Sequence, residues 1–283
     1  MILFFESGRL GNQLFQYCGL KQYFPEHNFV FFGCEDLQRH FDCSSTRFIP
    51  KSALVCWLPF RILRRIVFFL VAIRIFSRIT EESDSELFKL TIRKGFFSDI
   101  CVTQNIYFQH CDFVDQIKMT PRLNANLIQV AHDWLTEKLI DQNSNSLIFV
   151  HIRRGDYLNW PSTEFPAVLD LAWYKRSMKF MQEKIKNPVF ILMSDDQFYL
   201  RDVFKDLDGL IISDNPPEVD MALMSLCHSG ILSASSFAWW GAFFARSKLR
   251  REGTFLAPQY WCGHRVKKWY PTGFITNWIT YQE

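Results

Sequence analysis

Two adjacent arginines follow directly on a run of apolar residues in the segment 146–158, SLIFVHIRRGDYL. The apolar residues 147–150 predict a buried strand, and open α/β sheets bind ligands at the carboxyl ends of such strands. Arg153 and Arg154 suit a phosphate or pyrophosphate there, because each planar guanidinium group can donate two parallel hydrogen bonds to oxygen atoms. His151 adds an imidazole just before them. The segment therefore predicts an anion-binding loop.

The residues after the arginines belong to the same loop. Gly155 allows a tight backbone turn, which would bring the carboxylate of Asp156 back toward the arginines. The alternative interpretation is a surface loop whose charges are simply solvated. The buried strand in front of the loop and the nearby imidazole favour the anion-binding interpretation.

Three further predicted strands also end in polar residues, at 194–196 (SDD), 213–215 (SDN) and 233–236 (SASS). In the last of these, Ser235 and Ser236 precede a predicted helix that begins at Phe237. Serine hydroxyls at a helix N-terminus often cap the helix. The same hydroxyls and the free N–H groups can also hold a phosphate, with support from the helix dipole. Both interpretations stay open at this point.

Asp220 lies in the first turn of a predicted helix over residues 218–228. The helix dipole favours an acid at this position whatever its function. As a ligand contact, the carboxylate could accept hydrogen bonds from both N–H donors of a guanine edge. The residue alone does not decide between these interpretations.

A second candidate anion site lies near the N-terminus, where the glycine-containing loop 7–12 (SGRLGN) connects a predicted strand over 2–6 to a predicted helix over 13–23. Free N–H groups at the start of that helix would favour an anion. Two glycines three residues apart are weak evidence by themselves, because the loop does not match the GxGxxG pattern.

The elements that position these residues alternate regularly in the second half of the chain. The predicted strands are 147–152, 188–194, 209–213, 230–235 and 254–257, and the predicted helices are 172–186, 198–205, 218–228 and 237–247. Strands that alternate with helices through short connections predict a parallel, doubly wound sheet.

The first half is less regular. A strand over 30–33, a short strand over 106–108 and a helix over 121–140 are predicted, and residues 36–100 show no clear pattern. The polar stretch 141–146 (DQNSNS) is the clearest linker. The predicted fold class is therefore α/β, with two Rossmann-like domains that face a cleft, over 1–142 and 146–283.

Composition excludes several protein classes. The net charge of +3 is too small to suggest nucleic acid, and the basic residues are not grouped with aromatic ones in a nucleic-acid-binding module. The eight cysteines show no CxxC pair or zinc-ligand spacing, which favours reduced thiols in a cytosolic protein. The N-terminus reads as a strand and not as a signal peptide, so we expect a cytoplasmic protein.

The segment 57–79 is basic and apolar, with five arginines and no acid. Its uninterrupted apolar run, 66–73, is far shorter than the roughly 20 residues needed to cross a bilayer. Such a helix can lie peripherally in a membrane interface, here the inner face of the membrane. It can also pack on the protein with its arginines extended at the edges. On one ideal helix the arginines of the two halves would not share a face, which weakens the membrane interpretation.

Four segments resemble the α-1,2-fucosyltransferases of glycosyltransferase family 11, especially the bacterial ones. They are 8–17 (GRLGNQLFQY), 151–157 (HIRRGDY), 194–196 (SDD) and 220–244 (DMALMSLCHSGILSASSFAWWGAFF). The resemblance implies a GT-B-type fold and inverting transfer of fucose from GDP-β-L-fucose, without a metal or other cofactor, to the 2-hydroxyl of a terminal β-galactoside. Residues between about 36 and 120 match nothing in the family, so we expect the acceptor-specific surface there.

The resemblance also implies roles for single residues. Arg153, assisted by Arg154, would hold the pyrophosphate, and His151 would contact the nucleotide or orient the loop. The remaining residues expected to bind the donor are Asn12 and Gln13 near fucose or phosphate, Asp220 at guanine, and Ser235, Ser236 and Phe237 near the phosphates.

Asp156 is the candidate catalytic base, because it lies on the loop that would hold the donor. It could instead orient Arg153, and Glu6 at the end of the first strand is a third candidate. Related α-1,6-fucosyltransferases use a glutamate at the position of Pro161, so that base is absent here. The formal DxD at 206–208 is little better than a chance match for a metal-binding motif.

Three rival functions remain. They are a hydrolase of nucleotide-sugars, a fucosyltransferase of another linkage, and a non-catalytic protein at the membrane that binds nucleotide-sugars. The expected partners are GDP-fucose and an oligosaccharide or glycolipid acceptor with a β-galactoside end, but no nucleic acid. The natural acceptor cannot be read from the sequence.

Overall fold

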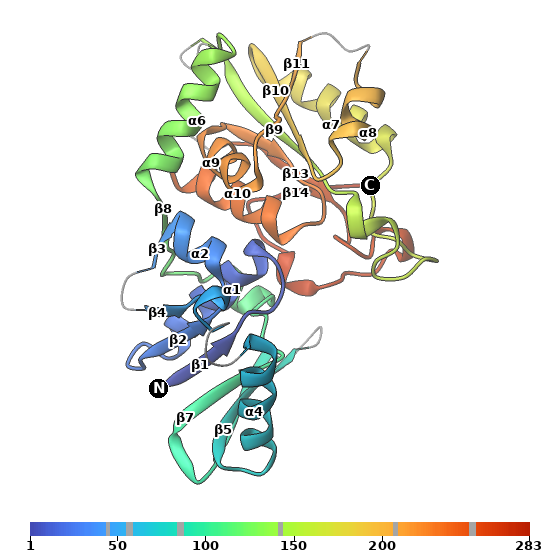
Figure 1. The fold of residues 1–283 in the computed structure, drawn as a ribbon. Coiled ribbons are helices and arrows are strands. Elements are labelled where there is room, and N and C mark those ends of the chain that lie inside the picture. Colours follow the sequence, from blue (N-terminus) through green and yellow to red (C-terminus); the bar gives the residue numbers. More distant parts are fainter. Residues whose placement is uncertain (44–45, 55–58, 84–87, 141–143, 206–208, 249–252) are drawn as a thin grey trace. The chain divides into compact units, whose positions relative to one another are not determined.

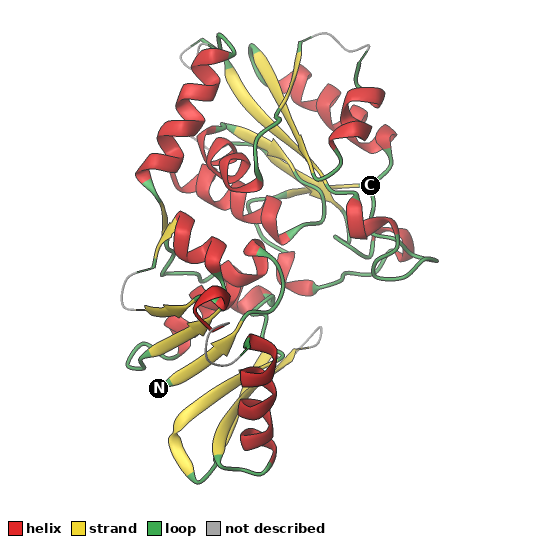
Figure 2. Cartoon of the chain, in the orientation of Figure 1, coloured by secondary structure: helices red, strands yellow, loops and turns green. Residues whose placement is uncertain are grey.

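The computed structural model describes residues 1–43, 46–54, 59–83, 88–140, 144–205, 209–248 and 253–283, which form two compact units (Figure 1). Unit 1 comprises Met1–Leu123 with Thr272–Phe274, and unit 2 comprises Asn124–Pro271 with Ile275–Glu283. Each unit has its own six-stranded sheet with helices packed on it (Figure 2).

Unit 2 contains a fully parallel sheet with the strand order β11-β10-β9-β12-β13-β14. The strands are β9 (Ser146–Ile152), β10 (Pro188–Ser194), β11 (Leu210–Ile212), β12 (Ser229–Ile231), β13 (Phe255–Pro258) and β14 (Thr280–Gln282). Six of the seven residues of β9 are buried, as expected for a central parallel strand covered on both faces. Numbered from β9, the strand order is 3-2-1-4-5-6, that of a dinucleotide-binding sheet. Strands that follow β9 are added first on one side of it and then, from β12 on, on the other side, so the strand order reverses between β9 and β12.

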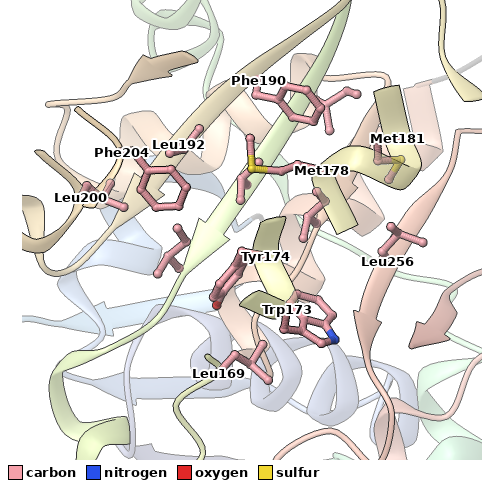
Figure 3. Close-up of a cluster of buried hydrophobic side chains, with 14 residues drawn as sticks. Leu169, Trp173, Tyr174, Met178, Met181, Phe190, Leu192, Leu200, Phe204 and Leu256 are labelled. Carbon is pink, nitrogen blue, oxygen red and sulfur yellow. The ribbon is translucent and has the colours of Figure 1, made fainter. Parts of the chain in front are cut away.

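Helices cover both faces of this sheet (Figure 1). They are α6 (Ala125–Glu137), α7 (Leu171–Lys184), α8 (Gln197–Val203), α9 (Pro217–Leu226) and α10 (Ser236–Lys248), together with the 3-10 helices η1 (Gly155–Leu158) and η2 (His264–Val266). Figure 3 shows Trp173, Tyr174 and Met178 of α7 in the core between the helix and the sheet. Burying each such side chain contributes about 1.5–3 kcal/mol to the free energy of unfolding. These contacts hold in place the strands whose ends form the candidate site.

Unit 1 has the strand order β4-β2-β1-β7-β5-β6, in which only the edge strand β6 is antiparallel to its neighbour among the described residues. The strands are β1 (Ile2–Phe5), β2 (Phe29–Phe32), β4 (Thr46–Ile49), β5 (Phe76–Ser83), β6 (Phe88–Arg93) and β7 (Phe97–Gln104), with a separate pair β3 (Phe41–Asp42) and β8 (Arg122–Leu123). The helices are α1 (Leu10–Tyr23), α2 (Glu35–His40), α3 (Lys51–Leu54), α4 (Phe60–Ala72), α5 (Cys111–Val114) and η3 (Thr272–Phe274).

Two predictions for unit 1 are wrong. Residues 36–100, expected to be irregular, contain α3, α4 and nearly all of α2, the strands β3, β4, β5 and β6, and the start of β7. The strand predicted at 106–108 is a loop, and the strand beside β1 is β7, over 97–104. The backbone explains the error, because Phe108 adopts a left-handed φ of 53°, which a strand does not tolerate, although its ring is fully buried.

The boundary between the units also differs from the predicted linker. It lies between Leu123 and Asn124, because α6 packs against α9 of unit 2. Ala131, Trp134 and Leu135 are the buried residues of α6, and the Trp134 indole donates to Asp214 Oδ1 at 3.4 Å. Residues 141–143, within the predicted linker, lie outside the described residues.

The basic, apolar segment 57–79 is not one helix. Residues 57–58 lie outside the described part, α4 ends at Ala72, and β5 begins at Phe76. Among the described residues, no helix combines the length and the hydropathy needed to cross a bilayer. Seven of the eight cysteines are described, and none of these seven is in a disulfide.

Candidate functional site

The arginine loop of unit 2 lies where the strand order of the sheet reverses, between β9 and β12. Ligands of open α/β sheets bind in the crevice at such a point, outside the carboxyl ends of the strands. The two strand ends are joined directly, since the Ser233 N–H donates to the His151 carbonyl at 3.1 Å. Polar residues that follow β9, β10 and β12 therefore come together at one edge of the sheet.

Arg153 is fixed between two carboxylates. Its Nε and Nη2 donate to Asp156 Oδ1 at 3.0 and 2.6 Å. Its Nη1 lies 2.9 Å from Asp195 Oδ2. The side chain is only 13 % exposed, so the guanidinium group is held in one orientation before any ligand binds.

Arg154 is fixed by the neighbouring strand β10. Its backbone N–H donates to Asp195 Oδ1 at 2.9 Å, and its Nε donates to Asp196 Oδ2 at 3.1 Å. The guanidinium carbon lies 3.5 Å from the centre of the Tyr199 ring, a cation–π contact. The register explains the pairing, because Ser194 lies opposite Ile152 and the acids after one strand meet the arginines after the other.

Gly155 is required for a different reason from the predicted one. Its backbone is not left-handed, so glycine is not needed for its conformation. A Cβ atom at this position would lie 2.5 Å from Asp195 Oδ2, closer than such contacts allow. The glycine therefore lets the loop approach the carboxylate that holds both arginines.

Asp156 is half exposed, and its Oδ1 accepts both hydrogen bonds from Arg153. This geometry matches the role of orienting Arg153. Asp156 can act as a catalytic base to the extent that these hydrogen bonds are released when a substrate binds.

His151 is buried beneath the loop. Its Nδ1 lies 2.7 Å from Ser233 Oγ, and its ring centre lies 5.6 Å from that of Phe237. Burial, and secondly the charge of Arg153, lower the pKa of His151 to about 3. The imidazole is therefore neutral near pH 7 and serves to connect β9 with the loop after β12, which makes a direct nucleotide contact the less favoured of its two predicted roles.

The N-terminus of α10 meets the same strand end. Ser235 Oγ accepts a hydrogen bond from the Phe237 N–H at 3.3 Å, the geometry of a helix cap. Ser236 is the first residue of α10 and is partly exposed, as is Phe237. The capping interpretation of Ser235 is confirmed, and the helix dipole adds partial positive charge at this edge.

Asp220 forms a buried polar pair at the end of β11. Ser213 Oγ donates to Asp220 Oδ1, and Asn215 Nδ2 donates to Ser213 Oγ at 3.0 Å. Burial raises the pKa of Asp220 to about 7, Ser213 opposes this, and Asp214 and Glu218 reinforce it. A ligand that presents N–H donors to this carboxylate would favour its charged form.

The predicted site residues of unit 1 hold the loop after β1. Gln13 is 3 % exposed, and its Nε2 donates to the Gly8 carbonyl at 3.2 Å. Asn12 is partly exposed, and its Oδ1 accepts from Gln109 Nε2 at 2.8 Å. Gln13 is thus placed to shape the loop from below, and the contact with a donor that the resemblance implied stays a prediction.

Glu6, the other candidate for the base, uses both carboxylate oxygens within unit 1. Oε1 lies 2.8 Å from Lys51 Nζ, and Oε2 accepts from the Cys34 N–H at 2.8 Å. A carboxylate held in this way serves to join β1 to the two segments that follow β2 and β4. We regard Glu6 as a weaker candidate for the base than Asp156.

Unit 1 also has a small polar cavity at its own strand reversal, between β1 and β7. The cavity measures about 160 Å³ and lies at the carboxyl ends of these strands. Its polar lining residues are Ser7, Arg64, Thr103, Gln104 and Asn105. Hydroxyl, amide and guanidinium groups of this kind can hydrogen-bond a hydroxylated ligand.

Among the described residues, the one group of three side chains close enough to share a metal ion is His110, Cys111 and Asp112. The His110 Nδ1 already accepts from the Asp112 N–H at 3.3 Å as a helix cap. The DxD at 206–208 lies outside the described residues.

The sequence left four important residues out of the site. Asp195 and Asp196 hold the arginines, and Ser213 and Ser233 hold Asp220 and His151. All four lie in the polar segments at the ends of predicted strands, so the signal was present. What was missing was the register that pairs one strand end with another.

The chain is similar both to a protein family as a whole and to several single proteins. The model of glycosyl transferase family 11 matches residues 6–282. The O-antigen biosynthesis glycosyltransferase WbnK of Escherichia coli is 28 % identical over 165 residues, 55 % of this chain and 52 % of that protein. An Escherichia coli alpha-1,2-colitosyltransferase is 36 % identical over 120 residues, 40 % of each chain. Galactoside alpha-(1,2)-fucosyltransferase 1 of Bos taurus is 26 % identical over 148 residues, 49 % of this chain and 41 % of that protein.

The chain thus spans about half the length, or less, of the curated relatives that it matches. Two solved structures share its fold. A family 9 glycosyl transferase from Veillonella parvula has a TM-score of 0.54 at 11 % identity, over 90 % of this chain and 80 % of that one. POFUT1 in complex with GDP has a TM-score of 0.54 at 10 % identity, over 90 % and 97 %. The predicted GT-B-like α/β class, with two parallel-sheet units, is confirmed.

Proposed function

The chain belongs to glycosyltransferase family 11, and we propose that it transfers L-fucose from GDP-β-L-fucose, with inversion, to the 2-hydroxyl of a terminal β-galactoside. The observation that supports this most is the pair of arginines fixed by three aspartates at the strand reversal of unit 2. The family match and the names of the α-1,2-transferring relatives support the same reaction class.

The proposed donor site uses two places along the edge of the unit 2 sheet that is formed by the carboxyl ends of its strands. Asp220, at the end of β11, would accept the N–H donors of guanine, and a bound guanine would favour its ionised form. Arg153, Arg154 and the N-terminus of α10 would face the pyrophosphate. As the bond to fucose breaks, negative charge grows on the β-phosphate, and the fixed guanidinium groups stabilise it without reorganisation.

Inversion requires in-line attack by the acceptor hydroxyl while positive charge develops on the sugar ring. Asp156 is our candidate for the base that takes the hydroxyl proton. Its second candidate role is to position Arg153, which the two hydrogen bonds from that residue favour.

The cavity between β1 and β7 is our candidate for part of the acceptor site. Its volume is near that of a single sugar ring, and its lining is mostly polar. Six of its nine lining residues lie in the region for which the family resemblance offered no match, where an acceptor-specific surface was expected.

We further propose that transfer needs no metal ion. Arg153 and Arg154 lie at the proposed pyrophosphate position, and guanidinium groups can hydrogen-bond phosphate oxygens directly, without a bridging cation. Activity that survives EDTA would support this, and activity restored only by added Mg²⁺ or Mn²⁺ would contradict it.

The deciding experiment is incubation of the purified protein with GDP-fucose and lactose or N-acetyllactosamine in EDTA, followed by analysis of the product linkage. Arg153→Ala should abolish transfer, whereas Arg201→Ala, an exposed arginine on α8, should leave it unchanged. GDP-colitose is the competing donor, because one relative is a colitosyltransferase. A fucosyl product with another linkage would refute the 2-hydroxyl assignment, and GDP release without any product would favour hydrolysis.

A further inference from the structure

Helix α4 of unit 1 exposes apolar side chains on the face directed away from its sheet. Val67 and Val71 are buried against β5 and β7, along which the helix lies (Figure 1). With 3.6 residues per turn, positions 62, 66, 69 and 73 fall on the opposite side. Their exposed fractions are 45 % for Ile62, 44 % for Ile66, 61 % for Phe69 and 50 % for Ile73.

The turn between β6 and β7 extends this apolar surface. Phe96 is 82 % exposed and Phe97 is 53 % exposed. Their N–H groups donate to the carbonyls of Arg74 and Ile75, both at 2.8 Å, so these two residues lie beside the segment that follows α4. We call the six residues Ile62, Ile66, Phe69, Ile73, Phe96 and Phe97 the docking face.

Positive charge surrounds the docking face. The exposed basic residues on α4 and on the two turns beside it are Arg61, Arg64, Arg65, Arg74, Arg93 and Lys94. The segments 59–80 and 88–98 contain no aspartate or glutamate. Single exposed apolar residues are ordinary on a protein surface, but a continuous group of large ones bordered by charge marks an interaction site.

We propose that the docking face binds the surface of an anionic lipid bilayer, with its apolar side chains in the headgroup region and the arginines against the lipid phosphates. An apolar stripe with basic flanks is the composition of helices that lie in a membrane interface. The helix has 13 residues and is about 20 Å long, so it lies on the bilayer rather than across it.

A second copy of the chain is a poorer occupant of this face. In a symmetric dimer the same patch meets itself, so the basic border of one copy would lie against the basic border of the other. Phospholipid phosphates supply the opposite charge. Charge complementarity therefore selects the lipid surface.

The structure also removes the objection that the sequence raised. Projection of residues 57–79 onto one helix places its arginines on different faces. Since α4 ends at Ala72, Arg78 belongs to β5 and is not part of the helix. Arg61 and Arg65 are one turn apart and share a side of α4 next to the apolar stripe.

Sedimentation of the full chain with vesicles tests the proposal. Binding to phosphatidylcholine vesicles with about 30 % phosphatidylglycerol should exceed binding to pure phosphatidylcholine by about tenfold, and about 0.5 M salt should reduce it. Two double variants, Phe69→Ser with Phe96→Ser and Arg61→Gln with Arg65→Gln, should each weaken binding by about tenfold or more.

Matched controls come from unit 2. Phe198→Ser removes a phenylalanine that is 84 % exposed on α8, and Lys175→Gln with Lys179→Gln removes an exposed basic pair one turn apart on α7. Neither control should change vesicle binding. All variants replace exposed side chains outside the proposed donor site, so the thermal shift caused by GDP should be retained and shows that each is folded.

Absence of binding to the anionic vesicles would overturn the proposal, and so would equal losses in the variants and the controls. Concentration-dependent dimerisation that is lost in the Phe69→Ser, Phe96→Ser variant, without any vesicle binding, would assign the face to a second copy instead. Since transfer to a soluble acceptor is measured separately, its failure would not affect this result.

Discussion

Replacing Asp195 by asparagine should impair catalysis, although the residue is not placed against a substrate. Its Oδ2 lies 2.9 Å from Arg153 Nη1, and its Oδ1 accepts from the Arg154 N–H at 2.9 Å. Asparagine can keep the second contact through its oxygen. It then directs its NH₂ group at Nη1, so that two donors face each other and Arg153 loses one of its two fixed partners.

The magnitude follows from the contact that is lost. The two side chains are 23 % and 13 % exposed, and leaving a largely buried donor unpaired costs about 1–3 kcal/mol. If the arginine is needed in this orientation in the transition state, kcat/KM for fucosyl transfer should fall by about 5- to 150-fold. Loss of a negative charge near the pyrophosphate acts in the opposite direction on GDP affinity, so Kd for GDP should change less than kcat/KM.

The assay is steady-state transfer from GDP-fucose together with calorimetric titration of GDP. Asp202→Asn is the matched control, because Asp202 pairs with Lys205 at 3.6 Å on the surface and holds no part of the loop. A kcat/KM for Asp195→Asn within about threefold of the wild type would refute the reasoning, and so would equal effects of the two variants.

Three further substitutions in unit 2 lead to predictions. Gly155→Ala should reduce GDP affinity by about tenfold or more with little change in Tm, because a Cβ atom would displace Asp195. Calorimetry measures the affinity and thermal melts measure Tm. Unchanged affinity would contradict the steric argument. Because burial raises the pKa of Asp220 to about 7, the folded state loses stability as pH rises from the unfolded pKa to about 7, and the full loss is present at pH 8. Asp220→Asn should therefore stabilise the ligand-free protein at pH 8 and not at pH 4. GDP-fucose affinity should rise from pH 6 to pH 8 in the wild type and be flat in Asp220→Asn, as measured by titration. Ser235→Ala should lower the free energy of unfolding by about 1 kcal/mol through loss of the helix cap, measured by urea denaturation, whereas Ser247→Ala in the last turn of α10 should have a smaller effect.

The elements of unit 2 could be predicted from the sequence because each strand is a short apolar run that stops at a polar residue. β9, β10 and β13 follow this pattern and lie within one or two residues of their predicted bounds. Such runs arise where a parallel strand is buried on both faces. β14 was missed because none of its three residues, Thr280–Gln282, is an aliphatic residue and none is fully buried, as is possible at the edge of a sheet.

Unit 1 was harder because β4, β6 and β7 are less apolar than β1 and β2. β7 begins with three exposed residues and includes Asp99, so its pattern does not indicate a strand that pairs with both β1 and β5. Conversely, Ile106 and Phe108 are buried without being in a strand. Burial in a loop and burial in a short strand leave the same signal in a sequence, and only the pairing of distant segments separates them.

Pairing also decides what Asp156 does, and the sequence could only name its two roles. Oδ1 of Asp156 accepts two hydrogen bonds from the Arg153 guanidinium group, which leaves Oδ2 as the oxygen that could take a proton from an acceptor hydroxyl. Our hypothesis is that a bound pyrophosphate takes over the donors of Arg153 and thereby releases Asp156 to act as the base. Asp156→Asn should then lower kcat by about 100-fold or more and leave Kd for GDP nearly unchanged. If Asp156 only positions Arg153, the same substitution weakens GDP binding as well, so parallel changes in kcat and Kd would reject the base.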